Sequence, residues 1–75
     1  MRTKVIKIKP PAIRLDQLLK LSGEVSSGGE AKHLIFEGEV TVNGDVCVSR
    51  GRKIKDGDQV SIREDCCLSV CYEAD

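Results

Sequence analysis

Residues 14–44, RLDQLLKLSGEVSSGGEAKHLIFEGEVTVNG, decide the fold because they combine helix, turn, second helix and hairpin signals in that order. Leu15, Leu18 and Leu19 follow helical spacing, and Gly23 is a natural stop for the helix that they predict. The segment therefore predicts a short helical hairpin that leads directly into a small sheet.

A second helix is predicted to begin after Ser27. Ser27 and Glu30 have the spacing of a capping box, in which the hydroxyl and the carboxylate satisfy backbone N–H groups that lack a partner within the helix. Gly38 is the expected end of this helix. Its buried stripe is expected to consist of three apolar residues: Ala31, Leu34 and Ile35.

Alternating segments and turn signals predict the strands. Residues 4–9 alternate charged and apolar side chains, which favours a short edge strand that Pro10-Pro11 ends. Asn43-Gly44 is the strongest short signal for a hairpin turn, and alternating valines at positions 40, 42, 46 and 48 mark the strands on its two sides.

The C-terminal third adds two more strands. Asp56-Gly57 predicts a turn, after which Val60 and Ile62 alternate with polar residues, and a last strand is expected around residues 66–72. The predicted fold class is α+β, with two or three short helices packed on a small, mainly antiparallel sheet. The 75 residues are expected to form a single domain.

Charge is distributed unevenly along the chain, although the net charge is zero. Residues 1–55 carry eleven Lys and Arg against six Asp and Glu, whereas residues 56–75 carry one basic and six acidic groups. Such asymmetry indicates one binding face and one repelling or solvating face. An acidic segment that only aids solubility is compatible with the same pattern.

Neither a membrane segment nor a metal site is indicated. The longest apolar run is only a few residues and no secretory signal is present, so we expect a cytoplasmic protein without a membrane partner. Cys66 and Cys67 are adjacent in a predicted strand and point to opposite faces, which suits a shared metal poorly. Free thiols are therefore expected, with no cofactor, at all four cysteines: Cys47, Cys66, Cys67 and Cys71.

A family resemblance follows from residues already quoted. The chain resembles the S-four RNA-binding domain, which is named after ribosomal small-subunit protein four and is also called the alpha-L motif. The matching residues are Arg14-Leu15-Asp16, then Ser27, Ala31 and Lys32, then Gly38-x-Val40-x-Val42-Asn43-Gly44, and finally Gly57-Asp58-x-Val60-Ser61-Ile62.

The resemblance covers residues 12–63, the motif core, and implies an RNA-binding helical hairpin packed on a small sheet. It also implies recognition of structured RNA, either ribosomal or transfer RNA, and a role in translation, ribosome assembly or ribosome rescue. With little sequence outside the motif, the chain is similar to the small stand-alone bacterial form.

One position departs from the family pattern. Family members often carry an arginine directly after the residue that matches Ser27, where this chain has Gly28 followed by Gly29. Glycines at a helix start leave N–H groups and the helix dipole open to phosphate, which compensates in part for the missing guanidinium. A permissive turn before the helix is the alternative interpretation.

Ten residues are the candidate RNA contacts. Four of them lie between positions 50 and 55, on a predicted loop with Gly51 that is suited to gripping a phosphate backbone without reading its sequence. A solvated charged loop is the plainer interpretation of the same residues. The full set is Arg14, Lys20, Ser27, Gly28, Gly29, Lys32, Arg50, Arg52, Lys53 and Lys55.

The functional prediction is a non-catalytic, monomeric RNA-binding protein. Phe36 and Tyr72 are the only aromatic residues, so duplex shape or a folded junction is a better target than unpaired bases. His33 lies off the buried stripe and is expected to be a partly exposed helix residue, and no catalytic triad or phosphate-binding P-loop is present. Two alternatives stay open: a protein–protein adaptor that uses the acidic C-terminal face, and a binder that also accepts DNA.

Overall fold

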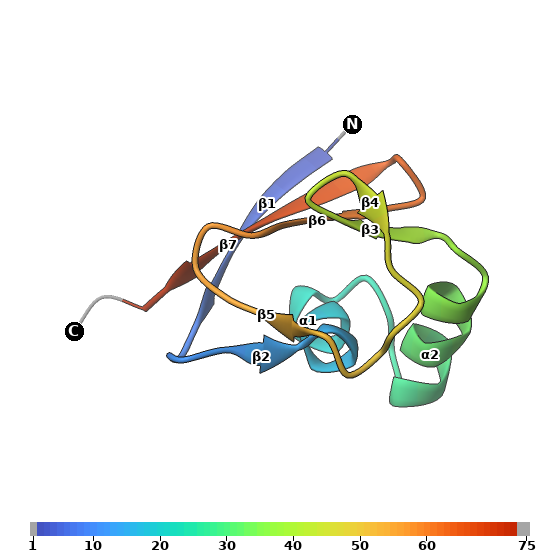
Figure 1. The fold of residues 1–75 in the computed structure, drawn as a ribbon, viewed down its shortest axis with the longest axis horizontal. Helices are drawn as coiled ribbons and strands as arrows, with labels where there is room; N and C mark the ends of the chain where they lie inside the picture. The colour runs from blue at the N-terminus through green and yellow to red at the C-terminus, as the bar shows by residue number, and fades with distance from the viewer. Residues whose placement is uncertain (1, 74–75) are drawn as a thin grey trace.

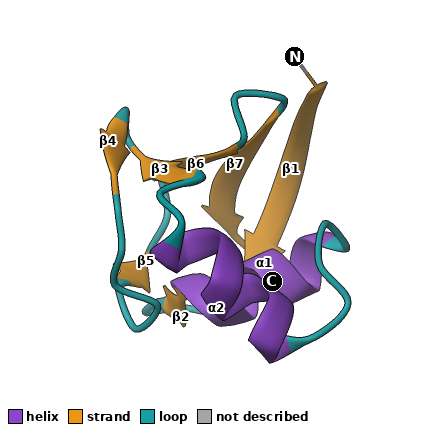
Figure 2. Ribbon diagram, turned by 90° about the vertical axis from the view of Figure 1, so that its right-hand side faces the viewer, coloured by secondary structure: helices purple, strands orange, loops and turns teal. Residues whose placement is uncertain are grey.

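Two helices pack on one face of a five-stranded sheet, and a small two-stranded sheet lies at the start of the first helix (Figures 1 and 2). The computed structural model describes residues 2–73. Its elements are β1 (Arg2–Ile8), β2 (Ile13–Arg14), α1 (Leu15–Ser22), α2 (Gly28–Phe36), β3 (Val40–Val42), β4 (Asp45–Val46), β5 (Lys53–Ile54), β6 (Gln59–Ile62) and β7 (Cys66–Tyr72).

The larger sheet has the strand order β1-β7-β6-β3-β4. All neighbours in it are antiparallel except β1 and β7, which pair in parallel with Arg2 opposite Cys66 and Ile8 opposite Tyr72. The α+β class and the mainly antiparallel sheet are thus confirmed, and residues 2–73 contain two helices rather than three. β1 is an edge strand, as its alternating lysines predicted.

Helix α1 ends, and helix α2 begins, at the residues that the sequence predicted. Gly23 closes α1 in the left-handed conformation, with φ of 81°, and the Ser27 hydroxyl accepts the Glu30 N–H at 3.2 Å at the start of α2. The second half of the predicted capping box is wrong. The Glu30 carboxylate binds Ser26 instead of Ser27, because Ser26 offers its hydroxyl at 2.9 Å and its N–H at 3.4 Å to one oxygen.

The Asn43-Gly44 turn is confirmed, since both residues have positive φ, 52° and 90°, as a two-residue hairpin of this type requires. The Asn43 amide also donates to the Asp58 carboxylate at 3.1 Å and ties this hairpin to the next turn. The return strand is shorter than predicted. It ends at Val46, and Val48 lies outside it with an exposed side chain.

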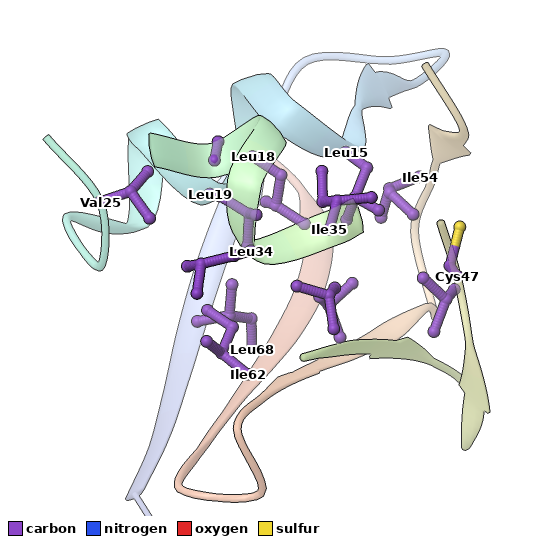
Figure 3. Packing of buried hydrophobic residues seen from close by; sticks show 14 of the residues in the cluster. Leu15, Leu18, Leu19, Val25, Leu34, Ile35, Cys47, Ile54, Ile62 and Leu68 are labelled. Carbon is purple, nitrogen blue, oxygen red and sulfur yellow. The ribbon is translucent and has the colours of Figure 1, made fainter. Parts of the chain in front are cut away.

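The core lies between the helices and the inner face of the large sheet. Ala31, Leu34 and Ile35 of α2 are buried, as the helical spacing predicted. Figure 3 shows the side chains of Leu15, Ile35 and Ile54 converging from α1, α2 and β5. Leu15, Ile35 and Ile54 are fully buried, so β5 belongs to the core although it has only two residues.

Ion pairs and hydrogen bonds join β1 to the end of α1. Lys4 donates to the Ser22 carbonyl and to the Glu24 carboxylate, both at 3.0 Å, and Arg2 reaches the same carboxylate at 2.8 Å. The hydrogen bond from Lys4 holds the pKa of Glu24 below its usual range, against the opposing effect of desolvation. Two of the basic residues in the N-terminal half are thus occupied by structural contacts.

Neither described helix is long and apolar enough to cross a membrane.

Candidate functional site

Arg14 and Lys53 lie directly opposite each other in the two-stranded sheet. β2 and β5 pair antiparallel with Ile13 opposite Ile54 and Arg14 opposite Lys53. Like charges at opposed positions of a strand pair destabilise the sheet. The isoleucine pair lies next to this cationic pair, in which an acid within 4 Å engages Arg14 but not Lys53 across residues 2–73.

The start of α1 holds residues 50–55, which we call the basic segment, through backbone hydrogen bonds. The Leu15 N–H donates to the Arg52 carbonyl at 2.9 Å, and the Asp16 N–H donates to the Arg50 carbonyl at 3.1 Å. The basic segment therefore satisfies two N–H groups that have no partner within the helix. Three cations of this segment thus lie with Arg14 around the start of α1. We call these four residues the basic cluster: Arg14, Arg50, Arg52 and Lys53.

The predicted basic loop is in part a strand. Arg50 and Gly51 form a turn, but Lys53 belongs to β5 and is paired with β2. The loop prediction was wrong at this residue because two-residue strands leave no alternation to detect. The consequence for the site is rigidity, since β5 is fixed by the buried Ile54.

Asp16 lies inside the basic cluster and neutralises part of it. Its carboxylate is 3.2 Å from the Arg14 guanidinium, and Asp16 as a whole is only 9% exposed. Across residues 2–73, no ion pair within 4 Å engages Arg50, Arg52 or Lys53. In the sequence, Asp16 stood out only as part of the Arg14-Leu15-Asp16 motif; its spacing from Arg14 across the helix start was the signal for an ion pair between them.

Lys55 lies just beyond β5 and is associated with Asp58. The Lys55 N–H donates to the Asp58 carboxylate at 2.9 Å. Burial opposes the charge on Asp58, but this hydrogen bond, the Asn43 amide and the nearby Lys55 and Arg52 together hold its pKa below the usual range. Asp58 therefore partly balances the charge of Lys55 and, to a smaller extent, that of Arg52.

The start of α2 is open on the side of its two glycines. A Cβ at Gly28 would have no heavy atom within 4 Å, and one at Gly29 would meet only the Ser27 hydroxyl at 3.9 Å. Lys32 follows one turn later and is exposed. In both views, the connection that leads into β5 and the start of α2 lie at the lower end of the molecule (Figures 1 and 2).

Lys20 is separated from the other candidates. It lies in the last turn of α1, about 9 Å along the helix axis from Arg14. Its side chain is exposed, and no contact recorded for residues 2–73 joins it to the basic cluster. The structure thus assembles Arg14 with the basic segment and leaves Lys20 apart.

The acidic residues of the C-terminal segment do not form one face. Asp56 and Asp58 lie at the turn after β5, whereas Glu64 and Asp65 lie at the β6–β7 turn, at the upper end of both ribbon views (Figures 1 and 2). Asp56 accepts the Tyr72 N–H, and Asp65 is 3.4 Å from Arg2. Glu73 follows β7 and is exposed, and the acid at position 75 is outside the described residues. The described acids of this segment are therefore divided between two places, with Asp56 near Glu73 through its bond to Tyr72, and this division disfavours a single acidic adaptor face.

The cysteines follow the strand alternation expected for them. Cys66 is buried and Cys67 is half-buried on the opposite face of β7. Burial raises the pKa of the Cys66 thiol, and the hydrogen bond with Glu24 raises it further. This thiol is therefore a protonated part of the core.

Comparison with known proteins gives one consistent family. Residues 6–70 match the S4 domain family. The "Probable ribosome maturation protein RlbA" of Bacillus subtilis is 46% identical over 57 residues, which are 76% of this chain and 80% of that protein. The "Putative RNA-binding protein YbcJ" of Escherichia coli is 45% identical over 53 residues, which are 71% of this chain and 76% of that protein.

The fold is also found in solved structures. One of them is described as a pseudouridylate synthase, with a TM-score of 0.64 and 22% sequence identity over 68% of this chain. This chain covers only 22% of the synthase. The likeness therefore concerns the fold of one part of that protein.

Proposed function

The chain belongs to the S4 domain family, and from this we propose that it is a non-catalytic RNA-binding protein that docks its basic cluster on structured RNA. Two relatives support the proposal through their names, one as a ribosome maturation protein and the other as an RNA-binding protein. We extend it to a cytoplasmic monomer whose target is ribosomal or transfer RNA.

The opposition of Arg14 and Lys53 is the observation that carries the proposal. Asp16 pairs with Arg14 from one side, whereas no ion pair within 4 Å engages Lys53 across residues 2–73, so the opposed cations keep a net positive charge. A phosphate group bound at this pair balances that charge and accepts hydrogen bonds from both side chains. RNA binding therefore neutralises the positive charge that Asp16 leaves uncompensated.

The remaining candidates extend this contact. Arg50 and Arg52 flank the opposed pair through their bonds to α1, and the open start of α2 with Lys32 lies at the same end of the molecule. The basic cluster and the start of α2 are two cationic sites on a rigid scaffold. Such sites suit separate phosphates of a folded RNA, which is recognised by its shape. Lys20 and Lys55 are secondary contacts in this proposal.

The test is the salt dependence of RNA binding. A labelled ribosomal RNA hairpin and a transfer RNA hairpin are titrated with protein at several salt concentrations, followed by fluorescence anisotropy. Four phosphate contacts predict a slope of about −3 to −4 in log K against log salt. A variant with Glu at positions 50, 52 and 53 is expected to lose this binding.

A matched variant controls for net charge. Lys7, Lys9 and Arg63 are exposed cations outside the basic cluster, and their replacement by Glu changes the net charge by the same amount. This variant is expected to retain most of the affinity and of the salt slope. Equal losses in the two variants, or a flat salt response of the folded wild type, would refute the proposed interface. A DNA hairpin in the same titration tests preference for RNA.

A further inference from the structure

Phe36 is an exposed aromatic residue on the candidate interface side of α2. It is the only phenylalanine in the chain, and 55% of it is exposed rather than buried in the core. The Lys32 ammonium lies over its ring, 5.6 Å from the centroid. The other aromatic residue, Tyr72, is engaged differently, because its hydroxyl donates to the Pro11 carbonyl at 2.6 Å.

The position of Phe36 follows from the periodicity of α2. Ala31, Leu34 and Ile35 face the core, so residues three, four and seven positions after Gly29 fall on the opposite side. Phe36 is seven positions after Gly29 and four after Lys32. One exposed stripe, about 10 Å long, thus runs from the open helix start through a cation to an aromatic ring.

The contact with Lys32 preorganises the Phe36 ring for stacking against a second flat group. A lysine one turn earlier stabilises one orientation of the ring through a cation–π contact, which lowers the entropy lost when a second group stacks on it. Glu37 follows Phe36 directly and is exposed, so this end of the stripe disfavours a phosphate. The chemistry that fits is a flat, uncharged surface beside a phosphate.

We propose that Phe36 is a stacking platform for an unpaired base whose neighbouring phosphate is held by Lys32 and the start of α2. The proposal rests on the function proposed above and adds a base contact to an interface otherwise made of phosphate contacts. It revises the sequence-based expectation that unpaired bases are a poorer target than duplex shape or a folded junction. The preferred RNA is a hairpin or junction with a bulged nucleotide beside a duplex.

The test uses two RNA hairpins that differ in one bulged 2-aminopurine. The protein variants are Phe36→Leu and Phe36→Ala, the first of which keeps an apolar side chain of similar size. Both are expected to bind the bulged hairpin at least about fivefold more weakly, the lower end of the range for loss of one base–aromatic stack. They are expected to bind the fully paired hairpin as the wild type does.

Two further readouts separate stacking from charge. The salt slope of both variants is expected to match that of the wild type, because no phosphate contact is lost. The 2-aminopurine fluorescence is expected to fall when the wild type binds and to change little with the variants. Val5→Ala serves as the control, since Val5 is 66% exposed on β1, outside the basic cluster and α2.

The outcomes distinguish this inference from the proposed function. If the folded wild type binds neither hairpin in a salt-dependent manner, the proposed function itself fails. If the wild type binds both hairpins and Phe36→Leu matches it on the bulged one, the stacking role is refuted and the phosphate interface stands. Equal weakening on both hairpins also refutes stacking on a base, and would point to a role in docking a protein or in positioning Lys32.

Discussion

Replacing Asp16 with asparagine is expected to tighten RNA binding and to weaken the fold at the same time. Asparagine has the same shape and keeps a side-chain oxygen for the Gln17 N–H, which donates to the Asp16 carboxylate at 2.8 Å. What it removes is the negative charge 3.2 Å from the Arg14 guanidinium. The two effects have opposite signs because that charge favours the helix and repels phosphate.

The effect on binding follows from the geometry. A phosphate that pairs with Arg14 from the side away from Asp16 lies roughly 6 Å from that carboxylate, about 3 Å for each of the two contacts. Their repulsion in water is about 0.7 kcal/mol at that separation. Screening at 0.1 M salt, where the Debye length is about 10 Å, reduces it to about 0.4 kcal/mol. Affinity is therefore expected to rise about twofold at 0.1 M salt and about threefold at 0.01 M.

The effect on stability comes from the helix start and the ion pair. Loss of an acid in the first turn of α1 costs about 0.3–1 kcal/mol, and the partly exposed pair with Arg14 adds a few tenths. Urea denaturation is expected to show a decrease of about 0.5–1.5 kcal/mol in the free energy of unfolding. Affinities are measured by anisotropy on the same labelled hairpin at the two salt concentrations.

Glu64→Gln is the matched control, because it removes one negative charge at the opposite end of the molecule. At 0.1 M salt its effect on RNA affinity is expected to be negligible, because salt screens interactions between exposed charges that lie far apart. Weaker or unchanged RNA binding by Asp16→Asn, with the protein folded, would contradict a phosphate beside Arg14. An equal increase in both variants would indicate a general effect of net charge.

Three further predictions concern the anchoring of the site, its pH dependence and its open helix start. Ile54→Ala is expected to lower the free energy of unfolding by about 2–4 kcal/mol in urea denaturation, since Ile54 is fully buried beneath the basic cluster; Ile54→Val is expected to cost about 1 kcal/mol. Glu24 has a lowered pKa chiefly because Lys4 donates to it, so its ionised form contributes stability above the ordinary pKa of a glutamate, and this contribution is lost as the pH falls through the folded pKa. Glu24→Gln should therefore flatten that acidic part of the stability curve, measured by urea denaturation from pH 3 to 7, and an unchanged curve would contradict the assignment. Gly28→Arg is expected to raise RNA affinity about fivefold and to steepen the salt slope by nearly one unit, because the position is open and one phosphate contact is added; an unchanged slope would place the start of α2 outside the interface.

The elements with local signals were predictable from the sequence. Asn43-Gly44 specified its turn through two positive φ angles, and Ser27 specified the start of α2 through its hydroxyl. The last strand was expected at residues 66–72 and is found at those residues. Each of these signals acts between residues that are close in the chain.

The pairing of distant segments was not predictable in the same way. Alternation in β1 predicts an edge strand but contains no information on whether its partner runs parallel or antiparallel. β2 and β5 have two residues each, so neither shows a period, and the opposition of Arg14 and Lys53 appeared only in the structure. The candidate residues came from sequence, whereas their grouping depended on contacts between residues about 40 positions apart.

The parallel pairing of β1 with β7 has a consequence for the order in which the chain folds during synthesis. Arg2 pairs with Cys66 and Ile8 with Tyr72, so each residue of β1 can pair only after the ribosome has added the residue 64 positions later. The helical hairpin and the Asn43-Gly44 hairpin join nearer residues and are free to form first, while β1 emerges as an unpaired strand. Its lysines then have a second use, since they discourage association of nascent chains until β7 arrives.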